Sequence, residues 1–592
     1  MKHKWLPKVG FVLAAVLALA MFLPACSNDD TSSPTTTVDP DANIKNPDTF
    51  TIASIGSPDT LDPAAAYDNA SGEAILIVYE TLIMYDETNT TKFVPVLATE
   101  WTVSPDGKTY RFHIRQNVKF SNGNALTPSD VEYSFERGMV QDYIGSPQWM
   151  IFEPIFGSGI FSGDLTLAQI TNAINVDGEW VQFNLVAPYE PFLQILCGSW
   201  GCIVDKEWCI QQGDWDGTQA SFDTLNDPAP NDWPLQKIMM GTGPWSLEYW
   251  DQASEISFVK NANYWRTPAN FNRVVIKTVE EWTTRKLMLQ NGDADWVYVP
   301  MENYPEMVGL QGMNVYEKLP NVSLDGFFFV YDISTTSPYI GSGNLDGAGI
   351  PTDFFTDINV RKGFEYSFNW TTYITDVLGG NGFQPASPVV NGLAYYNPAL
   401  TTKYSFDKVK AEAAFRAAWG GQIWEKGFTM VLAYNSGNTS RKTACDILAA
   451  NINALNPKFH ITVAAQEWSS YSAQFVHHTL PCFQIGWLPD YMDAHNFIVP
   501  WMATYGYFSQ FQGWSTPEID ALIAQGIGSN VPATRQAIYD QLAQIYFDQA
   551  PGILLVQPSG NRYFKDWVKG FYFNPALPSS CGNIYALSKT YK

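Results

Sequence analysis

Residues 95–136 read PVLATEWTVSPDGKTYRFHIRQNVKFSNGNALTPSDVEYSFE. Within them, Thr109–Ile114 alternates apolar and polar side chains, a pattern typical of a half-buried strand. The apolar residues just before Asn122 and Gly123 predict a further strand that ends in a turn. Thr127 then predicts a helix start, because proline follows it in the first turn and an acid lies three residues after it. Strand, turn and helix signals alternate, so the fold class is predicted to be α/β.

The rest of the chain continues this alternation. Helices are expected over residues 407–419, 440–455 and 533–549, the last two with apolar side chains on one face. No repeat of fixed period is present, and a length of 592 residues is enough for several domains.

Charge and aromatic content narrow the function. The chain has 59 acidic and 35 basic side chains and a net charge of −24, which argues against a nucleic-acid partner because phosphate binding needs basic surface. Aromatic residues make up 15% and include 21 tryptophans, which suit cores and binding clefts.

The N-terminus has the features of an export signal. Lysines are followed by an apolar run over residues 9–23 and then by Leu-Pro-Ala-Cys ending at Cys26. The run is short for a transmembrane helix, although an uncleaved membrane anchor is the alternative. The motif resembles that of bacterial lipoproteins, which implies a signal peptide over residues 1–25 and a diacylglyceryl group on Cys26. The protein is therefore expected at the outer face of the cytoplasmic membrane, in the periplasm or on the cell surface.

Residues 26–47 are polar and rich in proline and threonine, which predicts a flexible tether. Six cysteines remain beyond Cys26, and an even number in an exported chain indicates disulfides whose pairing the sequence leaves open. Their spacings do not match common zinc sites. They are Cys197, Cys202, Cys209, Cys445, Cys482 and Cys581.

Common catalytic signatures are missing from the sequence. The motifs of serine hydrolases, P-loop proteins, zinc metalloproteases, thiol–disulfide enzymes and dinucleotide-binding domains do not occur. No enzyme activity and no cofactor are predicted. An exported glycoside hydrolase stays open as an alternative, because its paired carboxylates have no fixed spacing.

Seven blocks, in order, resemble the peptide/nickel class of extracellular solute-binding proteins that serve ABC importers, the dipeptide- and oligopeptide-binding family (family 5). Together they span nearly all of residues 50–592. The blocks are TLDPA (60–64), VYETL (78–82), residues 95–136, GTGPW (241–245), NANYWR (261–266), DINVRKGFEYSFNW (357–370) and GWLPDYMDAHNF (486–497).

The resemblance implies a type II periplasmic-binding-protein clamshell in its large three-domain form, with two lobes and a hinge of two crossing segments. It implies a monomer that captures a solute outside the membrane and presents it to a permease with ATPase subunits inside. Lobe I would comprise residues 48–78, 197–318 and 560–592, the inserted second domain residues 79–196, and lobe II residues 319–559.

The family's peptide-binding members suggest the site. The resemblance places the acid that receives a ligand's α-ammonium at Asp490, in a closed cleft where a charged amine can pair with it. Gly486 would let ligand backbone approach, and Trp487 would form a wall or belong to the core. Leu488 and the following proline replace a smaller pair usual in relatives, which leaves pocket size open.

Weaker candidates complete the predicted site. Asn69, Ala70 and Ser71 align with a stretch whose backbone meets peptides, or form a surface loop. Arg361 could meet a ligand carboxylate, although its block mostly packs lobe II. Asp490, Asp493 and His495 suggest nickel, but acids alone do not select that metal and His495 is expected to cap or face solvent, so no metal site is predicted.

A rival ligand within the same fold is an oligosaccharide, which the many tryptophans would suit through stacking on sugar faces. A peptide is preferred because Asp490 offers a carboxylate for which a neutral sugar has no cation. A short peptide is therefore the predicted ligand.

Overall fold

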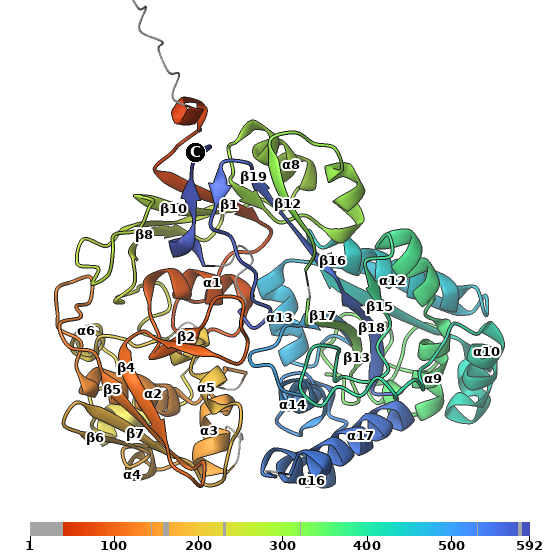
Figure 1. The fold of residues 1–592 in the computed structure, drawn as a ribbon. Coiled ribbons are helices and arrows are strands. Elements are labelled where there is room, and N and C mark those ends of the chain that lie inside the picture. Colours follow the sequence, from red (N-terminus) through yellow and green to blue (C-terminus); the bar gives the residue numbers. More distant parts are fainter. Residues whose placement is uncertain are drawn as a thin grey trace, which may run out of the picture.

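The structure is a computed structural model that describes residues 40–143, 145–157, 165–228, 232–319, 321–529, 531–577 and 583–592. The predicted signal peptide, Cys26 and Cys581 lie outside these residues. Two halves face one another across the middle of the molecule (Figure 1). Within the described part of the chain, no helix is both long and apolar enough to cross a membrane.

A seven-stranded sheet, here called sheet A, forms the upper part of the first half (Figure 1). Its central strand β1 pairs in parallel with β10 and β11, and β1 buries Phe50 and Ile52. Helix α1 (Asn69–Val78) contacts β8, and α8 (Trp282–Asn291) contacts β1 and β19. In sheet order the strands are β12 (Met313–Leu319), β19 (Gly560–Lys565), β11 (Trp296–Val297), β1 (Thr49–Ser54), β10 (Arg273–Thr278), β9 (Glu255–Lys260) and β8 (Trp245–Asp251).

Sheet B is a separate antiparallel sheet that includes strands from residues 95–136. Strand β5 has the predicted bounds, Thr109–Ile114, and buries alternate residues. Helix α2 (Pro128–Gln141) begins after Thr127, whose backbone N–H donates to the Asp130 carboxylate at 2.7 Å, as predicted. The strand predicted before Asn122 is wrong, because only an isolated bridge from Lys119 to Ala125 forms there.

The other elements of sheet B follow the same stretch. The sheet has the order β4 (Ala98–Val103), β5, β7 (Trp180–Asn184) and β6 (Ile174–Asp177). Near it lie the helices α3 (Trp149–Phe156), α4 (Leu167–Ile170), α5 (Phe192–Ile195), α6 (Lys206–Gln211) and α7 (Gln219–Leu225), and the hairpin of β2 (Ile83–Tyr85) and β3 (Phe93–Pro95).

Sheet C forms the second half, with the order β14 (Gly382–Phe383), β18 (Gly552–Pro558), β13 (Leu324–Phe329) and β17 (Cys482–Trp487). The parallel pair β15 (Phe428–Asn435) and β16 (Phe459–Gln466) lies beside it, since β15 contacts β17. The three predicted helices are confirmed as α10 (Lys408–Ala417), α12 (Thr439–Asn453) and α17 (Pro532–Gln549). The other helices of this half are α9 (Ile358–Ser367), α11 (Gln422–Lys426), α13 (Trp468–Val476), α14 (His495–Met502), α15 (Ser509–Gln512) and α16 (Pro517–Ile527).

The chain passes between sheets A and C twice. Strand β12 of sheet A is followed by β13 of sheet C, and β18 of sheet C is followed by β19 of sheet A. We take these two passages as candidates for the two crossing segments of the predicted clamshell. The exact division into lobes stays a prediction.

A buried ion network ties α1's neighbourhood to sheet B. Asp62, from the TLDPA block, accepts two hydrogen bonds from the Arg137 guanidinium at 2.8 and 2.5 Å, and Asp214 accepts a third from Arg137 Nε. All three side chains are buried. Since every charge has a partner, the network can hold the TLDPA block against α2 without leaving a buried charge unpaired.

The predicted tether begins to fold earlier than expected. Residues Pro40–Asn43 form a 3₁₀ helix, and the Tyr591 backbone N–H donates to Asp41 at 2.6 Å. Ile44 is buried in the core. The described residues before position 48 are therefore packed on the C-terminal residues, which a polar composition could not reveal.

The disulfide prediction is wrong for the five cysteines that the structure describes: each is a free thiol buried among apolar neighbours. Burial raises the pKa of these thiols, because the thiolate form is poorly solvated in the core. They act as small apolar side chains. Cysteine count alone cannot distinguish such residues from bonded ones.

Candidate ligand-binding cleft

A cavity of about 130 Å³ lies between the two halves. Tyr67, Asp68, Asn69 and Trp200 line it from the first half. The second half contributes the end of β17 and the loop after it, together with residues from α12, α13 and the segment before α15. These are Arg441, Trp468, Ile485, Gly486, Trp487, Leu488, Pro489, Asp490, Tyr507 and Phe508. The predicted segment GWLPD therefore faces a cavity between the halves.

Asp490 is half-buried at this cavity and is held by neutral donors. Its Oδ2 accepts from the Tyr67 hydroxyl at 3.0 Å and from Asn496 Nδ2 at 2.8 Å. Its backbone N–H donates to Asn496 Oδ1 at 2.7 Å. No lysine or arginine of the described residues forms an ion pair with it. Burial raises the pKa of Asp490 to about 7, against the smaller lowering effect of these hydrogen bonds.

Gly486 and its neighbours serve both cavity and core. A Cβ at Gly486 would lie 2.4 Å from Asp325 Oδ1, so glycine leaves room for that carboxylate as well as lining the cavity. The Trp487 ring is buried and packs against Tyr67, with ring centroids 5.5 Å apart. Leu488 is half-buried and lines the cavity.

Asn69, Ala70 and Ser71 form the first turn of α1 instead of a loop before it. The backbone N–H groups of Ala70 and Ser71 both donate to Asp68 Oδ1 at 3.0 Å. The Ser71 hydroxyl is buried and accepts from the Asp59 N–H. Of the three predicted residues only Asn69 lines the cavity. The N–H groups of Ala70 and Ser71 are already satisfied by the Asp68 cap.

Arg441 is the residue that sequence reasoning missed. It lies in the first turn of α12, is the one cation among the residues lining the cavity, and its side chain is 13% exposed. Its Nη1 donates to Asn435 Oδ1 at 2.8 Å, and its Nη2 lies 3.8 Å from Asp325 Oδ1. A signal was present in the sequence. A cation in the first turn of a helix is repelled by the positive end of the helix dipole, so its presence there indicates some other role.

The remaining candidates have structural roles. The Arg361 guanidinium is occupied by backbone carbonyls, at 2.6 Å from Phe355 O and 3.1 Å from Gln549 O. Asp493 pairs with Arg535 at 2.8 Å. His495 is fully buried, so the expectation that it caps or faces solvent is wrong. Among the described residues, no group of three or more His, Cys, Asp or Glu side chains is placed to hold a metal ion.

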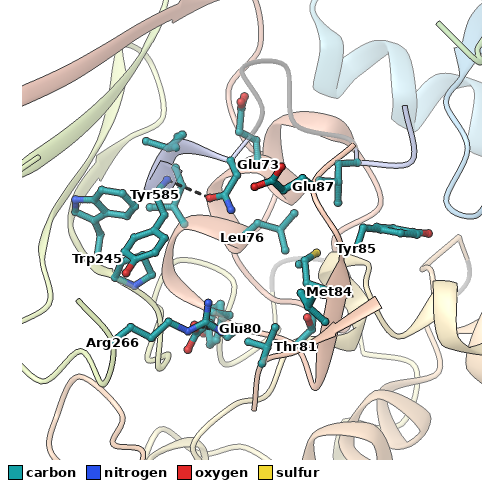
Figure 2. Close-up of a pocket in the computed structure, with 18 of the residues that line it drawn as sticks. Glu73, Leu76, Glu80, Thr81, Met84, Tyr85, Glu87, Trp245, Arg266 and Tyr585 are labelled. Atoms are coloured by element: carbon teal, nitrogen blue, oxygen red, sulfur yellow. Dashed lines mark hydrogen bonds and ion pairs between the residues drawn. The ribbon is translucent and has the colours of Figure 1, made fainter. Parts of the chain in front are cut away.

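A larger cavity, about 360 Å³, lies in the first half between α1, β2 and the C-terminal residues (Figure 2). Leu76 and Met84 lie in its middle, and Glu80 and Arg266 lie together at one end (Figure 2). The Glu80 carboxylate accepts from Thr242 at 2.9 Å and lies 3.9 Å from Arg266 Nη2. None of the predicted ligand-binding residues lines this cavity. Of the acids that line it, Glu80 already has a cation beside it, unlike Asp490.

Comparison with known proteins gives the family. The family model of the bacterial extracellular solute-binding proteins, family 5 Middle, matches residues 92–509, more than half of the chain. The chain belongs to this family. It is thus a solute-binding protein of the peptide/nickel class of ABC importers, as the sequence blocks predict, and the family is one of binding proteins.

Relatives of known name and structure agree with this assignment. The chain is 25% identical over 553 residues to the probable D,D-dipeptide-binding periplasmic protein of Escherichia coli strain K12, covering 92% of this chain and 94% of that protein. It also resembles the solved periplasmic binding protein DppA of Helicobacter pylori in complex with the peptide STSA, with a TM-score of 0.73 and 21% identity over 92% of this chain and 98% of that one. The type II periplasmic-binding-protein fold is confirmed.

Proposed function

We propose that the protein captures short peptides, of about dipeptide size, between its two halves. The observation that carries the proposal is the half-buried carboxylate of Asp490, which lies at the cavity with hydrogen-bond donors but forms no ion pair with any described residue. A ligand ammonium would supply that charge in a site largely closed to water. Arg441, in the lining of the same cavity, would receive a ligand carboxylate.

The size of the cavity supports a small ligand. Its volume of about 130 Å³ is below the range of roughly 300–1,000 Å³ common for pockets of drug-sized molecules. A free dipeptide carries an ammonium at one end and a carboxylate at the other, which suits the charges of Asp490 and Arg441. The Escherichia coli relative named as a probable D,D-dipeptide-binding periplasmic protein supports the same ligand class.

An oligosaccharide is the second candidate. The cavity is lined by Trp200, Trp468 and Trp487, whose rings could stack on sugar faces. A neutral sugar would leave the Asp490 carboxylate without an ionic partner in a closed site, which costs free energy, and it would give Arg441 no anion beyond Asp325. Peptide capture is therefore the leading proposal.

The proposal includes export and delivery. Cys26 would carry the lipid that holds the mature protein at the outer face of the cytoplasmic membrane, and the closed form would pass its ligand to the permease and ATPase subunits of an ABC importer. Mass spectrometry of the wild type should find the acyl group on Cys26. Cys26→Ala should abolish both lipidation and cleavage, and an unlipidated wild-type Cys26 would refute this part.

Native mass spectrometry of freshly purified protein tests the ligand most directly. We expect an added mass equal to that of a short peptide, which should disappear after partial unfolding and dialysis. Released material with the mass of a sugar would favour the second candidate, and a steady release of product from added oligosaccharide would indicate a hydrolase instead of a binding protein.

A further inference from the structure

The segment from Asp490 to Asn496 contacts the first half well beyond the cavity. Asp490 accepts a hydrogen bond from Tyr67, whose hydroxyl in turn accepts from Trp149 Nε1 of α3 at 2.8 Å. The Met492 backbone N–H donates to Gln194 Oε1 of α5 at 2.7 Å. The segment that contains the proposed ligand-binding acid therefore also rests against the helices of sheet B.

The most buried of these contacts joins His495 of α14 to Glu153 of α3. His495 Nε2 lies 3.1 Å from Glu153 Oε1, and His495 Nδ1 lies 2.7 Å from the Tyr491 hydroxyl. The Tyr189 hydroxyl donates to Glu153 Oε2 at 3.0 Å. The side chains of His495 and Glu153 are 0% and 7% exposed, so both are removed from water at a boundary between the two halves.

Among the residues that the structure describes, no charged group takes over this pairing. Tyr189 and Tyr491 contact the pair directly, and burial raises the pKa of both well above the ordinary value, so they act as neutral hydroxyls. Asp493 accepts from the His495 backbone N–H at 2.9 Å, but its carboxylate pairs with Arg535. Glu153 and His495 thus depend on one another across the boundary.

We propose that Glu153 and His495 are positioning residues that stabilise the closed form. Their contact joins helix α3, beside sheet B, to the segment from Asp490 to Asn496, although neither residue lines the cavity. The proposal rests on the proposed function for its effect on ligand. In the closed form the imidazole and carboxylate satisfy each other, and separating the halves breaks that hydrogen bond. A contact made only in the closed form shifts the population toward it and slows ligand release.

The proposal also implies a role for sheet B in closure. If the Glu153–His495 contact stabilises the closed form, the domain predicted over residues 79–196 moves together with the rest of the first half. The same boundary carries the ion pair from Arg535 to Glu190, at 2.7 Å, but Glu190 is 69% exposed, and solvent weakens such a pair. The buried pair should therefore dominate.

The test measures closure without ligand. A dye pair is attached through noncanonical amino acids at Val176 of β6 and Val409 of α10, which are 40% and 79% exposed and belong to opposite halves. Glu153→Gln and His495→Gln should each raise the mean distance between the dyes. Because the two act as one pair, the double variant should show no larger change than either single variant.

A matched pair elsewhere supplies the control. His113 Nε2 lies 3.0 Å from Glu179 Oε2 within sheet B, where both side chains are partly exposed and no boundary is crossed. His113→Gln and Glu179→Gln should leave the distance unchanged. Unchanged distances in the Glu153 and His495 variants, or additive changes in the double variant, would overturn the proposal.

Two further arms separate folding and ligand effects. If a variant lowers the thermal midpoint beyond that of the controls, Tyr189→Phe replaces it. This change removes a hydroxyl that donates to Glu153 and lies 3.4 Å from His495 Nδ1, and it should shift the distance in the same direction by less. With the dipeptide Ala-Leu as probe, Glu153→Gln should release ligand about tenfold faster. If Ala-Leu does not bind the wild type, peptide capture fails while the ligand-free distances still decide the role of the pair.

Discussion

Two acids of the same type in two sequence blocks of the same family have opposite surroundings. Asp62, in TLDPA, is fully buried and makes two hydrogen bonds to the Arg137 guanidinium. Asp490, in GWLPD, is half-buried at a cavity and is held only by a tyrosine and an asparagine. The first acid has its counter-ion in the chain, whereas the second has none among the residues that the structure describes. This difference is the basis for our proposal that Asp490 binds a ligand, whereas Asp62 stabilises the fold.

The largest expected effect is on the free energy of unfolding, through the ion network of Asp62, Arg137 and Asp214. Arg137→Met should lower the free energy of unfolding by about 3–5 kcal/mol, because Asp62 and Asp214 would be left buried without their cation. Urea denaturation measures the loss. Asp490→Asn in the same assay should not lower stability, because burial already disfavours the ionised form of Asp490. A loss equal to that of Arg137→Met would remove the distinction between the two acids.

The second effect is on affinity alone. Asp490→Ala should weaken Ala-Leu binding by about 30-fold to several thousand-fold, since losing one member of a closed charge pair costs about 2–5 kcal/mol. Calorimetric titration gives the dissociation constants. Asp493→Asn is not a suitable control because Asp493 pairs with Arg535, whereas Asp446→Asn, in an exposed pair with Lys442, should bind like the wild type.

A smaller effect concerns the other end of the ligand. Arg441→Gln should weaken binding of Ala-Leu by about tenfold or more, because the variant retains a donor but loses the charge. Binding of Ala-Leu amide should be weak in the wild type and nearly unaffected by the substitution. Equal losses for acid and amide would mean that Arg441 serves only Asn435 and Asp325.

The smallest expected effects are the pH dependences of stability and of Ala-Leu affinity that arise from Asp490. Desolvation raises the pKa of Asp490 from 3.8 to about 7 in the ligand-free protein. A raised carboxyl pKa contributes stability that is complete below about pH 4 and is lost as the pH rises through 7. Ala-Leu affinity should change in the opposite direction and increase from pH 5.5 to 7.5, because the ammonium needs the ionised acid. In Asp490→Asn both dependences should flatten, and an unchanged profile would contradict the assignment.

Local patterns were enough to predict much of the fold. The alternation in Thr109–Ile114 and the cap at Thr127 fix β5 and the start of α2, because both signals depend on neighbouring residues. The strand expected before Asn122 failed, since turn residues also occur where no partner strand pairs.

Site residues were harder to predict because their partners are distant in sequence. Asp490 meets Tyr67, 423 positions away, and Glu153 meets His495, 342 positions away. The resemblance predicts Asp490 as a site residue, but the buried state of His495 does not follow from local pattern, and Arg441 has only the signal of a cation in the first turn of a helix. The free cysteines teach the same lesson, since burial depends on the whole fold.

The central claim is that Asp490 pairs with a ligand ammonium. The measurement is calorimetric titration of the wild type and Asp490→Asn with Ala-Leu and with N-acetyl-Ala-Leu, which lacks the ammonium. We predict tight binding in one combination only, wild type with free Ala-Leu, and weak binding of similar size in the other three. Equal affinities in all four combinations would contradict the account and make Asp490 a structural acid.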